Sequence, residues 1–246
     1  MDLEELNSNI RHCTRCRLSE TRNNVLCGEG DIDTRVMLVA QAPGVEEDKK
    51  GVMFIGPSGK VLDDLLDRAD VSRDEIYMTN LIKCMLPDYR KPKQDEIEIC
   101  SRYLDKEIEM IEPDILVPLG YYASRYLFDK NGLDFEDKFV DLTGKLYLTD
   151  ERKIYPIAHP ASLLYDESFE EEMKENYEKL KTFLEPCKWY DLCPMKRFYE
   201  EDRLDRRWIE LYCKGDWENC VRYKKEKKGE HHPDNMLPDG SIDEDL

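Results

Sequence analysis

The sequence predicts an α/β protein, a three-layer sandwich with a central, mostly parallel sheet of four strands and a small cysteine-rich appendage at the C-terminal end. Two observations lead to this fold class: from residue 35 onward short apolar runs alternate with amphipathic stretches of helical length, and polar or Pro-Gly loops follow several of the apolar runs. Such alternation is typical of parallel strands joined by helices on both faces. A chain of 246 residues, 40% of them hydrophobic, can bury one such core and still leave a tail.

Four apolar runs predict the strands of this sheet. They cover residues 36–39, 76–80, 115–119 and 153–157. Pro118 and Pro156 indicate that the last two strands are short or end at the proline. Helical patterns are expected over residues 61–66, 95–111 and 169–183. In this arrangement the functional loops lie at the carboxyl ends of the strands.

The composition changes after Pro186. Residues 187–246 contain four cysteines, all three tryptophans and a mixed-charge run at 224–230, followed by an end rich in Pro, Gly and Asp. We therefore predict two units, a main domain at residues 1–186 and a cysteine-rich extension at residues 187–246. The composition of the last ten or so residues predicts disorder.

Charge and cysteine content limit the cellular setting. The chain has nine cysteines but shows neither a signal-peptide pattern nor an apolar run long enough for a membrane span. We expect a cytoplasmic protein without a membrane partner, whose thiols stay reduced and free for metals. The formal net charge of −18 argues against a uniformly basic nucleic-acid binder, but it leaves room for a local basic groove.

Four cysteines in the first hundred residues suggest a metal centre. Cys13 and Cys16 form a C-x2-C pair, and Cys84 and Cys100 follow later. Four thiolates suit either zinc or an iron-sulfur cluster, and the spacing alone does not choose between them. The alternative is two buried, inert cysteines beside an accidental pair. Cys27 is predicted to be structural.

Three loops carry residues suited to binding a base. Residues 40–44 form a Pro-Gly turn whose backbone could approach a ligand closely, and Phe54 offers a flat face for stacking, unless it is a core residue. The Asn80 amide could read the edge of a pyrimidine or simply cap its strand. His159, in a proline-containing loop, could face a ligand or be solvated.

Taken together and in order, these segments resemble the family 4 uracil-DNA glycosylases. The shared segments are Cys13 to Cys16, residues 40–44, residues 54–56, residues 80–84, Cys100 and residues 159–164. The resemblance covers about residues 1–185, and six ordered segments make it specific. It implies the uracil-DNA glycosylase superfold and an enzyme that hydrolyses the N-glycosidic bond of uracil in DNA, single- or double-stranded, leaving an abasic site. We expect it to act as a monomer.

The resemblance also implies roles for individual residues. The four early cysteines, Cys13, Cys16, Cys84 and Cys100, would hold a structural [4Fe-4S] cluster. Ala42 and Gly44 would belong to the substrate-binding loop. Phe54 would stack on a flipped-out uracil, Asn80 would read its edge, and His159 would stabilise the charge that develops on a uracil carbonyl. Leu163 or Leu164 would help to wedge the base out of the duplex.

One residue departs from the family pattern. Gln41 stands where family members usually carry Glu, and an amide can orient a water molecule but cannot take a proton. Glu47 lies close enough in sequence to supply a carboxylate. We therefore expect slower uracil excision or a changed substrate. The alternative is a non-catalytic or altered-substrate nucleic-acid-binding protein on the same fold.

The extension has a second cysteine set, which the resemblance does not cover. It consists of Cys187, Cys193, Cys213 and Cys220. Four cysteines within 34 residues could hold zinc or an iron-sulfur cluster, although the spacing matches no simple zinc ribbon, or they could be free thiols in a helical cap. The aromatic and basic residues nearby could contact a protein or nucleic-acid partner, or form a solvated face.

Overall fold

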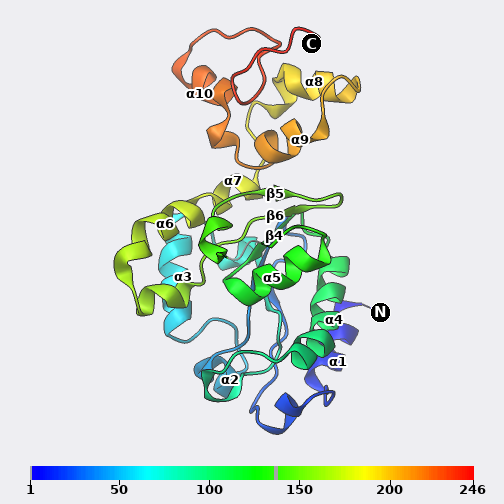
Figure 1. The fold of residues 1–246 in the computed structure, drawn as a ribbon, viewed down its shortest axis with the longest axis vertical. Helices are drawn as coiled ribbons and strands as arrows, with labels where there is room; N and C mark the ends of the chain where they lie inside the picture. The colour runs from blue at the N-terminus through cyan, green and yellow to red at the C-terminus, as the bar shows by residue number, and fades with distance from the viewer. Residues whose placement is uncertain (1, 136–137) are drawn as a thin grey trace.

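The computed structural model describes residues 2–135 and 138–246 and places one sheet between two layers of helices (Figure 1). Within these residues the sheet has six strands, in the order β1-β3-β2-β4-β6-β5. Their bounds are β1 Glu29–Gly30, β2 Val36–Ala40, β3 Tyr77–Asn80, β4 Ile115–Pro118, β5 Tyr147–Leu148 and β6 Lys153–Ile154. β3, β2, β4 and β6 are parallel, whereas β1 and β5 pair antiparallel at the two edges.

The four predicted parallel strands are confirmed, and the prediction of four strands in total was too low. The two edge strands are two residues long, too short to leave a hydrophobic pattern in the sequence. The prolines act as expected: Pro118 is the last residue of β4, and β6 ends before Pro156. Every residue of β2, β3 and β4 is buried, as is typical of parallel strands covered on both faces.

Helices cover both faces of the sheet. They are α1 Leu3–Arg11, α2 Val45–Lys50, α3 Pro57–Arg68, α4 Gln94–Ile111, α5 Tyr121–Lys130, α6 Glu170–Glu178, α7 Leu180–Leu184, α8 Pro194–Glu200, α9 Arg206–Trp208 and α10 Val221–Lys228. The helical patterns predicted at residues 61–66 and 95–111 lie inside α3 and α4, and the pattern at 169–183 is divided between α6 and α7.

The two halves of the core follow the alternation of side chains along β2. Val36 and Leu38 belong to an apolar cluster that includes residues of α3, α6 and α7. Met37 and Val39 belong to a second cluster, with residues of α1, α4 and α5. Successive side chains of a strand point to opposite faces, so one five-residue strand is packed from both sides. Figure 1 shows α3 and α6 on one side of the sheet and α1 and α4 on the other.

The extension packs as a small helical unit beyond the β5 edge (Figure 1). Its apolar cluster contains Met195, Phe198, Leu204, Ile209, Cys213 and Leu237. Two contacts fasten it to the main domain. Lys153 Nζ, buried on β6, lies 2.7 Å from the Glu210 carboxylate, and Trp217 Nε1 donates to the carbonyls of Thr182 and Glu185 at 3.0 Å. The extension therefore covers the edge of the sheet.

The chain end differs from the predicted disorder. Met236 and Ile242 form an antiparallel bridge, and Leu237 is buried. The Arg222 guanidinium, itself 3% exposed, donates to three backbone carbonyls of this segment, the closest being Met236 O at 2.7 Å. Composition could not reveal this order, because the donors come from a helix ten or more residues away in the sequence.

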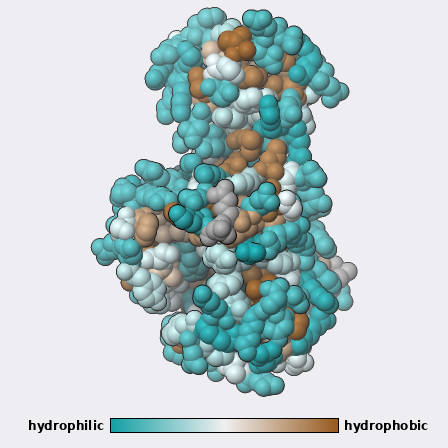
Figure 2. Space-filling view, viewed as in Figure 1, coloured by the Kyte–Doolittle hydropathy of each residue, from teal (hydrophilic) through white to brown (hydrophobic). Residues whose placement is uncertain are grey.

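The surface is mainly hydrophilic on the face in Figure 2, and hydrophobic residues gather where the extension meets the main domain. Of the helices in the described part of the chain, none is both long and apolar enough to cross a membrane.

Candidate active site and cysteine centres

A large pocket opens at the carboxyl ends of β2 and β3. Its volume is about 1720 Å³. The seven residues predicted for catalysis and substrate binding all line it: Gln41, Ala42, Gly44, Glu47, Phe54, Asn80 and His159. They come from separate loops, and the parallel register that pairs Ala40 with Asn80 brings the first two loops together. The structure thus gathers the whole predicted set in one cavity.

Phe54 is held in an unusual backbone conformation. Its φ of 50° lies in the left-handed region, which side chains other than glycine rarely adopt. The Arg73 guanidinium donates to the Phe54 carbonyl at 2.8 Å. At Gly59 a Cβ atom would lie 1.8 Å from the same carbonyl oxygen, so only glycine fits there. Arg73 and Gly59 therefore fix the position of the Phe54 ring, which is 6% exposed.

Asn80 is the last residue of β3 and is 3% exposed. Its Nδ2 donates to the thioether sulfur of Met53, which lies 3.0 Å away. A thioether is a weak acceptor. A ligand carbonyl can therefore replace this contact at little cost, while the burial of Asn80 keeps its amide in place.

His159 carries its proton on the ring nitrogen that faces away from its own loop. Nδ1 accepts a hydrogen bond from the backbone N–H of Ala161 at 3.1 Å, so the neutral ring is protonated at Nε2. Burial lowers the pKa of His159 to about 4, which keeps the imidazole neutral at physiological pH. The ring centroid lies 6.2 Å from that of Phe54. His159 is therefore a neutral N–H donor beside the stacking residue.

Glu47 brings a carboxylate to the pocket that has Gln41 at its other loop. Glu47 is 6% exposed, and its Oε1 accepts a hydrogen bond from the Gly56 N–H at 2.8 Å. A Cβ atom at Gly44 would lie 2.5 Å from the other carboxylate oxygen. The carboxylate is thus packed between two glycine turns. A buried carboxylate of this kind can hold or accept a proton from a water molecule in the pocket.

The residues after His159 are now distinguishable. Leu163 packs against the core, whereas Leu164 lines the pocket and is 47% exposed. Tyr165, which also lines the pocket, is 88% exposed. Of the two leucines named from sequence, only Leu164 is placed to reach a ligand. Tyr165 was missed, although an aromatic residue directly after the leucines was visible in the sequence.

Sequence reasoning also missed the supports of the pocket. Arg90 lines the pocket and makes two hydrogen bonds, of 2.8 and 2.6 Å, to the fully buried Glu96 carboxylate of α4. The Arg90 guanidinium lowers the pKa of Glu96. Lys91 and Lys93 follow on the same loop and are exposed. The cluster of basic residues at 90–93 was the available signal, whereas the contact of Arg73 with Phe54 leaves no local pattern.

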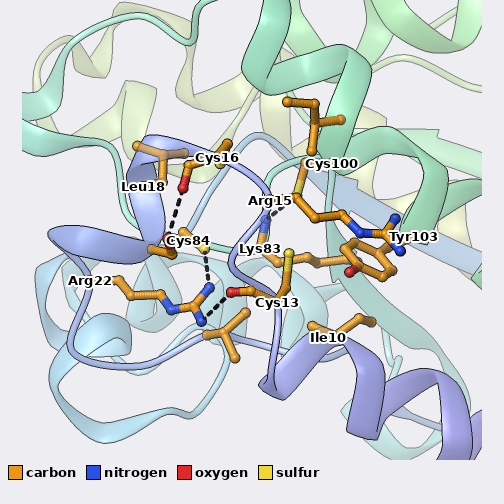
Figure 3. Close-up of a pocket in the computed structure, with 13 residues that line it drawn as sticks. Ile10, Cys13, Arg15, Cys16, Leu18, Arg22, Lys83, Cys84, Cys100 and Tyr103 are labelled. Carbon is orange, nitrogen blue, oxygen red and sulfur yellow. Dashed lines mark hydrogen bonds between the residues drawn. The ribbon is translucent and has the colours of Figure 1, made fainter.

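The early cysteines lie around a separate cavity of about 330 Å³ (Figure 3). Cys13 and Cys16 come from the loop after α1, Cys84 from the segment after β3, and Cys100 from α4. Cys27 is not part of this lining; its thiol lies 3.6 Å from the Asn7 carbonyl.

The donor set of this cavity fits an iron-sulfur cluster. The Arg22 guanidinium donates to Cys84 Sγ at 3.1 Å, and the Lys83 N–H donates to Cys100 Sγ at 3.2 Å. Four thiolates with N–H donors aimed at the sulfurs are what such clusters use. In the described ranges, no three His, Cys, Asp or Glu side chains are grouped to hold a metal ion. Burial raises the pKa of Cys100 to about 12, so a bound cation is needed to keep this sulfur ionised.

The four cysteines of the extension line a cavity of their own. It measures about 1160 Å³ and also has Trp189, Trp217, Tyr223 and His232 in its wall.

Comparisons with known proteins match the main domain. The sequence model of the Uracil DNA glycosylase superfamily matches residues 27–181. A type-4 uracil-DNA glycosylase of Sulfurisphaera tokodaii is 35% identical over 184 residues, covering 73% of this chain and 83% of the relative. Those of Archaeoglobus fulgidus (33% over 182 residues; 72% and 91%) and Thermotoga maritima (34% over 187 residues; 74% and 94%) are similarly related. The superfamily match ends before the extension.

Proposed function

The chain belongs to the uracil-DNA glycosylase superfamily, and from this premise we propose that it hydrolyses the N-glycosidic bond of uracil in DNA, leaving an abasic site. The observation that carries the proposal is the meeting of Phe54, Asn80 and His159, from three separate loops, in one pocket. The pocket lies at the carboxyl ends of parallel strands, where α/β proteins bind ligands. Relatives named as type-4 uracil-DNA glycosylases support the reaction.

Recognition begins with a uracil turned out of the DNA strand into the pocket. The Phe54 ring stacks on the base, and its fixed backbone means that little ordering is needed on binding. The Asn80 amide exchanges its contact with the Met53 sulfur for the donor and acceptor edge of uracil. Leu164 and Tyr165 at the pocket mouth fill the space that the base leaves.

Bond cleavage places negative charge on the departing uracil. The Nε2–H of His159 donates to the carbonyl on which this charge develops, and the neutral ring needs no proton transfer to do so. One such donor is worth about 3 kcal/mol of transition-state stabilisation. The Ala161 contact orients the ring before the substrate arrives.

Water attack completes the reaction. A sugar with oxocarbenium character needs little push from its nucleophile, so positioning the water contributes much of the effect. Gln41 orients the water through its amide, and Glu47 supplies the carboxylate that takes its proton. Because Gln41 cannot act as a base, we expect slower excision than a glutamate at this position would give.

The early cysteines are proposed to hold a [4Fe-4S] cluster. When bound, such a cluster joins the loop after α1, the segment after β3 and α4, and takes no part in the hydrolysis. Residues of this chain extend the connection to the pocket: Glu96 of α4 accepts from Arg90 in the pocket wall, and Arg17 in the cysteine loop lies 3.8 Å from the same carboxylate.

DNA binding is proposed to use a local basic surface. Lys91 and Lys93 are exposed beside Arg90 at the pocket, and their charges suit phosphates despite the net charge of −18. We assign residues 1–186 to the glycosylase domain and residues 187–246 to an extension. Since one chain supplies every pocket residue named here, a monomer is sufficient for activity.

The test is excision of uracil from a labelled single-stranded oligonucleotide, followed by cleavage at abasic sites. We expect the parent protein to release uracil and both Asn80→Asp and His159→Ala to lose about 100-fold or more of the rate. Both variants should keep the visible absorbance of the cluster. If the parent releases no uracil, or if both variants match it, the proposed reaction or its pocket is wrong.

A further inference from the structure

The four cysteines of the extension converge from three segments. Cys187 and Cys193 flank a helical turn at Tyr190–Leu192, Cys213 ends the turn at Ile209–Cys213, and Cys220 immediately precedes α10. The Cys187 N–H also donates to the Cys213 carbonyl at 2.8 Å. Every pair among the four thiols interacts electrostatically, and all four line one cavity. Such convergence is not needed for the packing of inert cysteines.

Backbone donors point at two of the sulfurs. The Trp189 N–H faces the sulfur of Cys187, and the N–H groups of Arg222 and Tyr223, in the first turn of α10, face the sulfur of Cys220. Hydrogen bonds of this kind stabilise thiolates, the form that binds metals. The Lys83 N–H makes the same type of contact with Cys100 in the main domain.

The extension needs a stabilising element besides its apolar core. Its 60 residues bury the small cluster around Met195 and Phe198, and no described strand of the sheet comes from it. All nine cysteines of the chain are free thiols in the structure. A core in a unit of this size supplies only about 3–5 kcal/mol, and small units commonly add a disulfide or a metal. Four converging free thiols point to the metal.

The geometry favours a cluster over a single zinc ion. Zinc at about 2.3 Å from four thiolates would hold the sulfurs about 3.8 Å apart and close the space between them. Here the sulfurs surround a cavity of about 1160 Å³. The spacings, five residues from Cys187 to Cys193 and six from Cys213 to Cys220, also exceed the two to four residues typical of zinc sites. Trp189 and Trp217, each 4.9 Å from the Tyr223 ring, form an aromatic wall beside it.

We propose that the four cysteines of the extension hold an iron-sulfur cluster of their own and that this cluster organises the extension. It would lie in the unit that Figure 1 shows at the opposite end of the molecule from α2. The superfamily match ends at residue 181, so the site is separate from the one that the main domain provides. Its role is structural: it joins three segments that have few apolar contacts of their own.

The test counts metals in the full-length protein purified without oxygen. Iron, acid-labile sulfide and zinc are measured per chain in the parent, in Cys193→Ser and Cys213→Ser of the extension, in Cys84→Ser of the main domain, and in Cys27→Ser as a control. If both centres are [4Fe-4S], we expect about eight iron and eight sulfide in the parent. Each extension variant should lose about half of both and still excise uracil at the parental rate, whereas Cys27→Ser should lose nothing.

Two further readouts keep the result clear. Limited proteolysis should cut the extension of Cys193→Ser while residues 1–186 stay intact. If Cys213→Ser precipitates because its side chain is buried, the more accessible Cys193→Ser and the parental count still decide. One zinc per chain that only the extension variants remove would overturn the proposal. So would parental iron and sulfide in both extension variants, or no iron beyond what Cys84→Ser removes.

Discussion

The backbone N–H of Ala161 donates to Nδ1 of His159 across 3.1 Å, and this one contact decides which ring nitrogen faces the pocket as a donor. The intervening Pro160 starts the helical turn that brings the Ala161 N–H back toward the ring. Protonation of the imidazole would put a proton on Nδ1 and set it against the Ala161 N–H. The loop and the neutral state of His159 are therefore mutually dependent.

This dependence predicts a loss of stability in mild acid. Burial holds the pKa of His159 at about 4, below its value of about 6.5 in the unfolded chain. Between these values the unfolded chain binds a proton that the folded chain excludes, so the free energy of unfolding falls as the pH drops from 6.5 to 4. Above pH 6.5 the contribution of His159 is complete.

Urea unfolding of the parent and of His159→Gln across this pH range measures the effect. The difference in unfolding free energy between the two proteins should shrink as the pH falls from 6.5 to 4. The excision rate of the parent should likewise stay level near pH 6.5 and decline only toward pH 4. A decline centred near pH 6.5 would mean that the ring is not held neutral by burial.

Glu47 provides the second prediction, because it is the buried carboxylate of the pocket. Glu47→Gln keeps an acceptor for the Gly56 N–H but removes the base, and we expect excision to slow by about 10- to 100-fold with little change in stability. Glu46→Gln, at the exposed neighbouring position, is the matched control. Equal rates in parent, control and Glu47→Gln would remove Glu47 from the mechanism.

The complementary change is Gln41→Glu. It restores a carboxylate on the other loop of the pocket, and we expect faster excision at neutral pH. Single-turnover kinetics on a uracil-containing oligonucleotide compares it with the parent, and Gln41→Ala reports the loss of water orientation alone. A slower Gln41→Glu would show that the pocket of this chain is adapted to an uncharged residue at position 41.

The sequence was informative where function follows the ends of strands. Asn80 and Gln41 could be placed together, because apolar runs predict where parallel strands stop and those strands end at one edge of a sheet. The conformation of Phe54 could not be predicted, since it depends on Arg73, 19 residues away. The ordered chain end was missed for the same reason: Arg222 supplies donors that local composition does not show.

The basic loop beside the pocket gives the fourth prediction. Lys91→Gln with Lys93→Gln should weaken binding to single-stranded DNA and lower the slope of log affinity against log salt by about 1.4, or about 0.7 per phosphate contact. The same change at Lys227 and Lys228 of α10, which Figure 1 shows at the opposite end of the molecule from α2, is the control. If both pairs change the slope equally, DNA does not use the loop at 90–93.

The last prediction concerns the cysteine centre of the main domain. Cys84→Ser should lose the iron of that centre and lower the melting temperature, because the Arg22 contact and the link between the loop after α1 and α4 depend on this sulfur. Excision should also fall, since Met85 and Leu86, the next two residues, line the substrate pocket.

Cys27→Ser distinguishes this effect from the loss of any thiol. Cys27 is partly buried in the same apolar cluster but lines neither cysteine cavity, so it should keep its iron, its melting temperature and its activity. Iron content, thermal unfolding and excision are measured on the same samples. A Cys84→Ser protein with full iron and parental stability would show that the cluster, if bound, does not use this residue. A protein that loses iron but still excises uracil would instead separate the cluster from the pocket wall, because then Met85 and Leu86 keep their places without it.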